Sequence, residues 1–272
     1  MKKIAVAAIQ LPTLGFNSTR LEFYFKNAHD RGVNLVLFGE YVLNHFFKEL
    51  KDIPLAMVQE QTIRHIEILQ AFAKRYNLTI IAPVVVVKKD KYIKSIAKIT
   101  PKRVAYREQQ ILISYKHWNE ERFFSNQQKP LSTPMFFIVE GFRVMVMSGF
   151  EIHFPEIWRY VRLHRIDLVL TPTSSTFGSH NRWREVLKTQ AFLHSCYVLR
   201  ANRLGEYSEH RTKWRFYGDS MLISPDGQVE MVLEDKESML VEEIDKQILV
   251  EARKAWKFDK IIKLKQRIDD DR

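Results

Sequence analysis

A strand, a sharp turn and a helix start follow one another in the middle of the chain. An uninterrupted apolar run at 144–147 ends in Ser148 and Gly149, and Pro155 and Glu156 follow a few residues later. The run predicts a strand that is buried on both faces, and Ser-Gly predicts an abrupt change of direction. Pro and an acid at these positions are typical of a first helical turn. Many α/β enzymes present a nucleophile on such a strand-turn-helix segment, so this segment favours an α/β fold.

Apolar and amphipathic segments alternate along the rest of the chain. Strands are predicted at 4–10, 33–38, 78–87, 135–139, 167–170, 197–202, 217–227 and 239–244, helices at 20–31, 54–76, 155–164 and 182–194 and again at the basic C-terminus, and an antiparallel pair at 91–99 and 102–109. This mixture predicts sheets covered by helices. With 272 residues, 46% of them hydrophobic, the chain can bury a large core. We expect one domain over residues 1–272.

The charge of the chain is strongly positive but spread along the sequence. Lys and Arg number 43 against 32 Asp and Glu, which gives a net charge of +11. No nucleic-acid-binding motif accompanies the basic residues, so a solvated basic surface is favoured over a nucleic-acid partner.

A single cysteine, Cys196, rules out an intramolecular disulfide and any multi-cysteine zinc site. It lies in an apolar run, which favours a buried and inert thiol over a reactive one. No apolar run reaches 18 residues, and the run at 4–9 is too short for a signal peptide. We therefore expect a cytoplasmic protein without a membrane span.

Three predicted loops at strand ends carry chemically capable side chains. Glu40 follows the strand at 33–38, Lys116 lies near Glu120 and Glu121, and a third loop begins at Ser148. A carboxylate base, a lysine that stabilises an oxyanion and a nucleophile would together suit attack on an amide or nitrile carbon.

The chain resembles the nitrilase or carbon–nitrogen hydrolase superfamily over nearly its whole length. The segment 216–227 is similar to the family's F-x-G-x-S-x-x-x-x-P-x-G strand, 197–203 to its Y-V-x-x-x-N-R stretch, and 167–172 to the strand that follows the nucleophile helix. The resemblance implies a four-layer α-β-β-α sandwich and a Glu-Lys-Cys triad, with Glu40 as the glutamate. It further implies a small amide-like ligand and a homodimer or higher homo-oligomer, and we expect neither a metal nor another cofactor.

The nucleophile position departs from the family motif, which reads roughly C-[YW]-[DE]-x-x-[FY]-P-E. Aligning the Phe-Pro-Glu end places Gly149 on the cysteine, Phe150 on the aromatic residue and Glu151 on the acid. Glycine offers no nucleophile. Ser148 is adjacent, but a shift of one residue along a strand turns a side chain to the other face. Ser148 is therefore a poor substitute for the missing cysteine.

The lysine position is also displaced. The family loop commonly reads K-x-H, and aligning on His117 places Tyr115 on the lysine, with Lys116 one residue late. Glu120 or Glu121 resembles the second glutamate that supports the lysine in many members.

These alignments define a candidate site, in which the predicted catalytic positions are Glu40, Lys116 and the vacant nucleophile position Gly149, and the predicted substrate-binding residues are Glu121, Ser148, Phe150, Glu151 and Thr173. Each assignment has an alternative. Glu40 could be an ordinary loop acid, Lys116 a solvent-facing lysine, Glu151 a charge that complements a helix N-terminus, and Thr173 a loop cap.

Our first functional hypothesis is a family member that has lost cysteine-dependent amidase chemistry and keeps a small-molecule pocket. It predicts no turnover of amides, carbamoyl amines or nitriles, with Gly149→Cys as the change that could restore some. The alternative is an active amidohydrolase that uses Ser148 or a water activated by Glu40. A further alternative is a glycine introduced in place of a natural cysteine.

Overall fold

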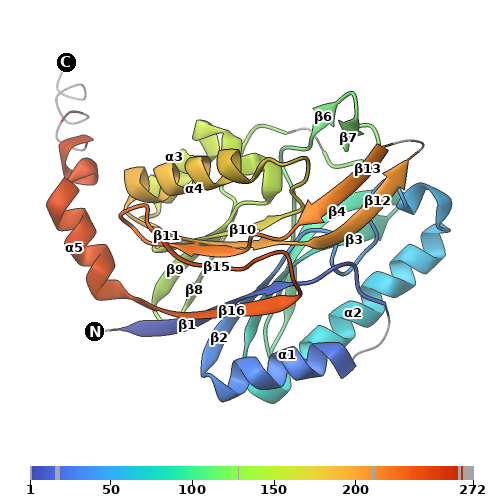
Figure 1. The fold of residues 1–272 in the computed structure, drawn as a ribbon, viewed down its shortest axis with the longest axis horizontal. Helices are drawn as coiled ribbons and strands as arrows, with labels where there is room; N and C mark the ends of the chain where they lie inside the picture. Colours follow the sequence, from blue (N-terminus) through green and yellow to red (C-terminus); the bar gives the residue numbers. More distant parts are fainter. Residues whose placement is uncertain (1, 16–18, 128, 210–211, 263–264, 266–272) are drawn as a thin grey trace.

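The computed structural model describes residues 2–15, 19–127, 129–209, 212–262 and 265, and it contains two six-stranded sheets (Figure 1). The first sheet has the order β16 (Ser238–Asp245), β1 (Lys3–Gln10), β2 (Val33–Phe38), β3 (Thr79–Lys88), β4 (Lys91–Ile99) and β5 (Val104–Glu108). The second has the order β15 (Val229–Val232), β14 (Met221–Ile223), β11 (Tyr197–Asn202), β10 (Leu168–Thr173), β9 (Phe142–Val146) and β8 (Met135–Val139). Three neighbouring strands are parallel in each sheet, β1-β2-β3 and β9-β10-β11, and antiparallel strands flank them.

Helices cover the outer face of each sheet. Helices α1 (Thr19–Asp30) and α2 (Leu55–Tyr76) pack on the first sheet, and α3 (Pro155–Leu163) and α4 (His180–His194) pack on the second (Figure 1). Helix α5 (Lys246–Trp256) follows β16 at the edge. The predicted α-β-β-α sandwich is confirmed. No helix in the described part of the chain combines the length and apolarity that a membrane crossing requires.

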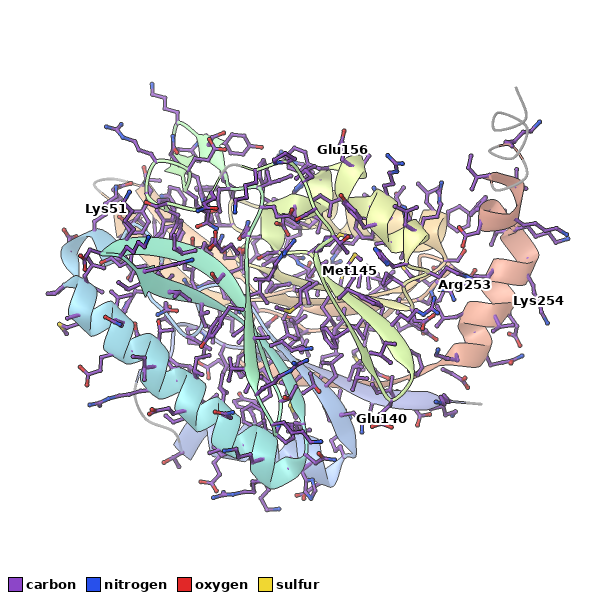
Figure 2. All side chains as sticks on the ribbon, turned by 180° about the vertical axis from the view of Figure 1, so that it is seen from behind. Lys51, Glu140, Met145, Glu156, Arg253 and Lys254 are labelled. Carbon is purple, nitrogen blue, oxygen red and sulfur yellow. The ribbon has the colours of Figure 1, made fainter. Side chains whose placement is uncertain are left out.

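Three apolar layers hold the sandwich together. One lies between α1, α2 and the first sheet, one between the two sheets, and one between the second sheet and α3 and α4. Met145 of β9 belongs to the third layer and lies inside the molecule in Figure 2. Its neighbours Val144 and Val146 face the first sheet instead. Strand β9 is therefore buried on both faces, as its unbroken apolar run predicted.

Apart from the strand at 217–227, the predicted strands and helices are confirmed, with shifts of a few residues at their ends. The structure adds a hairpin, β12 (Leu204–Glu209) with β13 (Thr212–Tyr217), a short pair, β6 (Ser114–Tyr115) with β7 (Trp118–Asn119), the strand β15, and two 3-10 turns, η1 (Leu50–Asp52) and η2 (Gly149–His153). The segment 217–227, predicted as one strand, supplies only the end of β13 and the short β14. In β13 the buried Trp214 and Phe216 alternate with the exposed Lys213 and Arg215, which is a strand pattern, although no strand was predicted here before residue 217.

The end of β2 lies against the end of β11 from the other sheet. A Cβ on Gly39 would come within 2.9 Å of the Arg203 backbone nitrogen and 3.2 Å of the Ala201 carbonyl oxygen, so only glycine fits this approach. The next residue, Glu40, donates its backbone N–H to the Thr173 carbonyl at 3.1 Å. Gly39 thus fixes Glu40 where the two sheets meet.

Candidate functional site

Glu40 is the centre of a buried cluster at this junction. Its side chain is 5% exposed. Lys94 Nζ lies 3.0 Å from Oε1, the Ser148 hydroxyl donates to Oε1 at 2.9 Å, and the Ser174 hydroxyl donates to Oε2 at 2.9 Å. A buried carboxylate needs such partners to remain charged. Three segments from the two sheets therefore hold one carboxylate in place.

Lys94 of β4 joins Glu40 to a second acid. Its ammonium donates to Glu120 Oε1 at 2.7 Å, and Glu120 is fully buried. The Tyr41 hydroxyl donates to the same Glu120 oxygen at 2.5 Å. Burial by itself would lower the pKa of Lys94, but Glu120 and Glu40 outweigh it and the pKa is raised. Two carboxylates thus share one charged lysine.

Gly149 opens the turn η2 directly beside Glu40. Its φ is +33°, a value that side chains rarely adopt, and a Cβ built on it would lie 2.9 Å from both oxygens of the Glu40 carboxylate. The Glu40 carboxylate therefore occupies the space that a nucleophile's side chain would need.

Cys196 is not part of this cluster. It is fully buried in the layer under α3 and α4, and burial raises the pKa of its thiol to about 12. A thiol of this kind is neither ionised nor accessible near neutral pH. The prediction of a buried cysteine is confirmed.

Lys116 is not brought to Glu40. It is exposed on the short β6-β7 hairpin, lines the pocket described below, and forms no ion pair with any described residue. Tyr115 and His117 on either side are exposed as well. The lysine that contacts Glu40 is Lys94, so Lys116 is a wall residue and not a partner of the carboxylate.

The two adjacent glutamates of the same loop point in different directions. Glu121 is exposed and lies outside the pocket lining, whereas Glu120 is buried against Lys94. The backbone N–H groups of both donate to the Ile113 carbonyl. Of the two candidates that the sequence left open, Glu120 therefore occupies the place next to the lysine.

Glu151 is buried below the turn and does not line the pocket. Its carboxylate accepts the backbone N–H of Ser148 at 2.9 Å and of Gln110 at 2.7 Å. Burial raises the pKa of Glu151 to about 7, against the effect of these hydrogen bonds. Phe150 does line the pocket, with its ring 5.5 Å from that of Tyr115 in an edge-to-face contact.

Thr173 belongs to a second buried cluster, centred on Arg200. The Thr173 hydroxyl donates to Asn202 Oδ1 at 2.8 Å and accepts from Arg200 Nε at 3.1 Å. Arg200 also donates to Ser175 Oγ at 2.8 Å and to Asp219 Oδ2 at 3.0 Å. Thr173 is therefore a structural neighbour of the pocket and not part of its surface.

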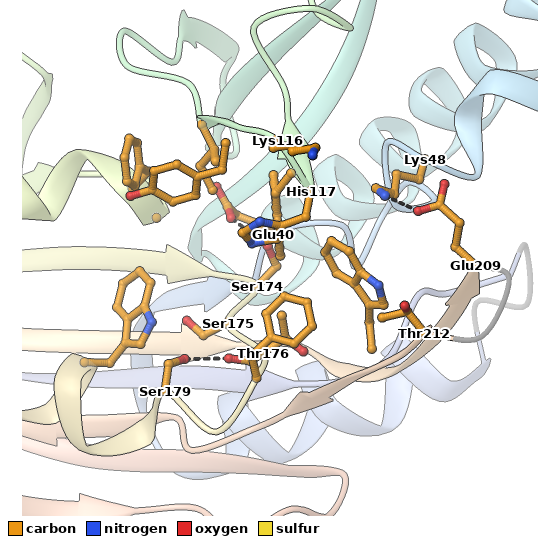
Figure 3. Close-up of a pocket in the computed structure, with 18 of the residues that line it drawn as sticks. Glu40, Lys48, Lys116, His117, Ser174, Ser175, Thr176, Ser179, Glu209 and Thr212 are labelled. Carbon is orange, nitrogen blue, oxygen red and sulfur yellow. Dashed lines mark hydrogen bonds and ion pairs between the residues drawn. The ribbon is translucent and has the colours of Figure 1, made fainter.

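A pocket with a volume of about 1050 Å³ opens over Glu40 and Gly149 (Figure 3). The rest of its lining is mostly hydroxyl, aromatic and basic side chains, together with Ile113 and the acid Glu209: Ser174, Ser175, Thr176, Ser179 and Thr212; Tyr115, His117, Trp118, Phe150, Phe177, Trp183 and Trp214; and Lys48, Lys51, Lys116 and Arg182. A small molecule of drug size would fit such a volume.

Sequence reasoning missed Lys94, although the sequence carries a signal for it. Side chains two residues apart on a strand share a face, so Lys94 faces the same side as Ile96, which packs between the sheets. Lys98 satisfies the same alternation. Only the strand register, which pairs Lys94 with Val85 and brings it to the Glu40 end of the sheet, distinguishes the two lysines.

Comparisons with known proteins agree with this fold. The chain is 26% identical over 105 residues to the deaminated glutathione amidase of Synechocystis, and this match spans 38% of each protein. In three dimensions it is similar to the carbon-nitrogen hydrolase from Helicobacter pylori, with a TM-score of 0.80 and 18% identity over 94% of both chains. It is also similar to a Glu-to-Gln mutant of an amidase from Nesterenkonia, which shows covalent addition of the acetamide moiety of fluoroacetamide at the active-site cysteine, with a TM-score of 0.75, 17% identity and coverage of 94% and 97%.

The two structural similarities support the fold alone, because both identities are below one fifth. The sequence itself supports more. The profile of the family described as carbon-nitrogen hydrolase matches residues 5–254, nearly the whole length of the chain. This protein therefore belongs to the carbon-nitrogen hydrolase family.

Proposed function

We propose that this family member has lost cysteine-dependent hydrolysis and uses the pocket over Glu40 to bind a small amide-like molecule. The observation that supports this most directly is the position of Gly149. Residue 149 carries no thiol, and the Glu40 carboxylate fills the space in which a side chain would stand. The chain's one thiol, Cys196, is buried elsewhere.

The surroundings of Gly149 also oppose a simple reversal. In Gly149→Cys the new Cβ would collide with a carboxylate that Lys94, Ser148 and Ser174 hold in place. The positive φ at residue 149 adds backbone strain. We therefore expect Gly149→Cys to restore no turnover unless Glu40 moves away.

Two measurements test the loss of thiol chemistry. Fluoroacetamide, whose acetamide moiety adds to the active-site cysteine in a Glu-to-Gln mutant of the Nesterenkonia amidase, should leave the mass of the folded protein unchanged, because Cys196 is buried. Ammonia release from acetamide, benzamide and 4-carbamoylbenzoate should not exceed that of the Glu40→Gln variant. Ammonia release well above this control would contradict the proposal.

A second candidate function is an active amidohydrolase with a different nucleophile. It is favoured by the 2.9 Å hydrogen bond from Ser148 Oγ to Glu40 Oε1, since a hydroxyl beside a carboxylate resembles a nucleophile beside its base. Ser148 is 1% exposed and does not line the pocket, which weighs against direct attack. If hydrolysis is observed, rates that survive both Ser148→Ala and Glu40→Gln would remove this candidate.

The remaining expectations for the whole protein stay predictions. These are a homodimer or larger homo-oligomer, a cytoplasmic location, and a lack of specific nucleic-acid binding. The last is tested by measuring whether binding to a DNA duplex persists at physiological salt.

A further inference from the structure

The mouth of the pocket carries positive charge that the protein does not neutralise. Lys51, Lys116 and Arg182 line the pocket, and none of them forms an ion pair with a residue that the structure describes. Lys48 is different, because it is paired with Glu209 and lies over the Trp214 ring at 4.6 Å. Three uncompensated cations therefore surround one opening.

The floor of the pocket has the opposite preference. Glu40 is the acid at the bottom, and the Ser174 hydroxyl already donates its proton to it, so that the Ser174 oxygen can only accept a further hydrogen bond. Thr176 likewise donates to the Arg215 carbonyl at 2.6 Å. Figure 3 shows Glu40 between Lys116 on one side and the Ser175 to Ser179 segment on the other. The floor suits a hydrogen-bond donor and disfavours an anion.

Aromatic rings form much of the wall between floor and mouth. Phe177 and Trp214 are in contact, with ring centroids 4.6 Å apart, and Phe177 is 49% exposed at the opening. Tyr115, 51% exposed, contacts Phe150 on another part of the lining. Exposed rings of this kind favour a planar or apolar group between them.

We propose that the ligand is amphiphilic: a neutral donor such as a primary amide faces Glu40, a planar or apolar group contacts the rings, and an anionic group lies among Lys51, Lys116 and Arg182. This inference rests on the proposed function, since it assumes that the pocket binds a small molecule. The anionic group is a carboxylate or a phosphate, since arginine and lysine bind both.

Calorimetric titration with four related probes tests the inference. We expect 4-carbamoylbenzoate to bind about tenfold more tightly than its neutral methyl ester at low salt, and to lose most of this advantage at high salt. Terephthalate should bind more weakly than 4-carbamoylbenzoate, because one of its carboxylates would face Glu40. Comparison with 4-carbamoylphenyl phosphate decides which anion the mouth prefers.

Substitutions locate the anionic end. Lys51→Gln, Lys116→Gln and Arg182→Gln should each weaken binding of 4-carbamoylbenzoate by about threefold and leave binding of the methyl ester unchanged. Lys254→Gln is the matched control, because Lys254 is also exposed but lies at the opposite end of the molecule from Lys51 (Figure 2). It should change neither affinity.

Equal affinity for the charged and neutral probes, or an effect of Lys254→Gln as large as that of Lys51→Gln, would overturn the inference. So would a complete lack of binding by all four probes. None of these results would bear on the loss of thiol chemistry, which ammonia release and fluoroacetamide labelling measure separately.

Discussion

Two buried ionic clusters lie on either side of the segment 173–175, and they differ in charge balance. In the first, Glu40 and Glu120 share the single cation Lys94. In the second, Arg200 and Arg184 share the single anion Asp219. The first cluster also borders the pocket through Glu40, whereas Arg200 is fully buried and reaches the pocket lining through Ser175 and through the Trp183 ring, 5.0 Å from its guanidinium carbon.

The two clusters differ in how strongly each depends on a single cation. Removing one cation from the second cluster leaves Asp219 paired with the other, so the loss of either arginine alone should destabilise that cluster less. In the first, Lys94 is the one cation among the described residues that forms an ion pair with Glu40 or Glu120, and Arg203 interacts with Glu40 only at longer range, so its stability depends mainly on Lys94. An arrangement that depends on one residue is costly for a fold and is typical of a site kept for binding or chemistry.

The largest expected effect is that of Lys94→Met. The substitution would leave the Glu40 and Glu120 carboxylates buried without a cation, and we expect a loss of about 3–5 kcal/mol in the free energy of unfolding. Urea denaturation measures it. Lys98→Met is the matched control on the same strand and face, and its partly exposed lysine should cost less than about 1 kcal/mol. Equal losses in both variants would show that Lys94 is not the element that holds the first cluster together.

The second expected effect concerns Glu151, a buried acid that accepts hydrogen bonds from backbone N–H groups and forms no ion pair with a described residue. Its pKa is raised from 4.5 to about 7 in the folded protein, mainly by burial. Between these two values the folded state retains a proton that the unfolded state has lost, so stability falls as the pH rises through this window. The full change is about 3 kcal/mol, at about 1.4 kcal/mol per pH unit.

Urea denaturation from pH 4.5 to 8 of the parent protein and of Glu151→Gln measures this effect. In the variant, the free energy of unfolding should fall less steeply with rising pH than in the parent protein, whatever its absolute value. The difference between the free energies of unfolding of the two proteins at each pH cancels the contributions of other titrating groups. These include His65 and His194, whose pKa values are lowered by burial. Glu121→Gln changes an exposed carboxyl in place of a buried one, and it should leave the slope of the free energy of unfolding against pH unaltered.

The sequence predicted the layers of the fold well because its strands and helices have strong apolar periodicity. It also assigned Glu40 and Gly149 to one candidate site through two separate family motifs, and the two residues are adjacent in the structure. It could not place Lys94, because a lysine within a strand looks the same whether its partner is water or a pair of carboxylates. The partners come from β2 and from the loop at Glu120, and only the assembled sheet brings them together.

The third expected effect is that of Arg200→Met. It would remove hydrogen bonds to Thr173, Ser175 and Asp219, but Asp219 would keep Arg184. We expect a loss of about 2 kcal/mol in the free energy of unfolding, clearly smaller than that of Lys94→Met. A loss equal to or larger than that of Lys94→Met would remove the distinction between the two clusters.

The smallest expected effects, about 1 kcal/mol each, are those of Ser174→Ala and Ser175→Ala. These adjacent hydroxyls face different clusters, because Ser174 bonds to Glu40 and Ser175 to Arg200. If the clusters are independent, the double variant should lose the sum of the single losses to within about 0.5 kcal/mol. A larger deviation in this double-mutant cycle would mean that the segment 173–175 couples them. Arg200 would then influence the carboxylate at the floor of the pocket, and substitutions there would change ligand affinity without touching the ligand.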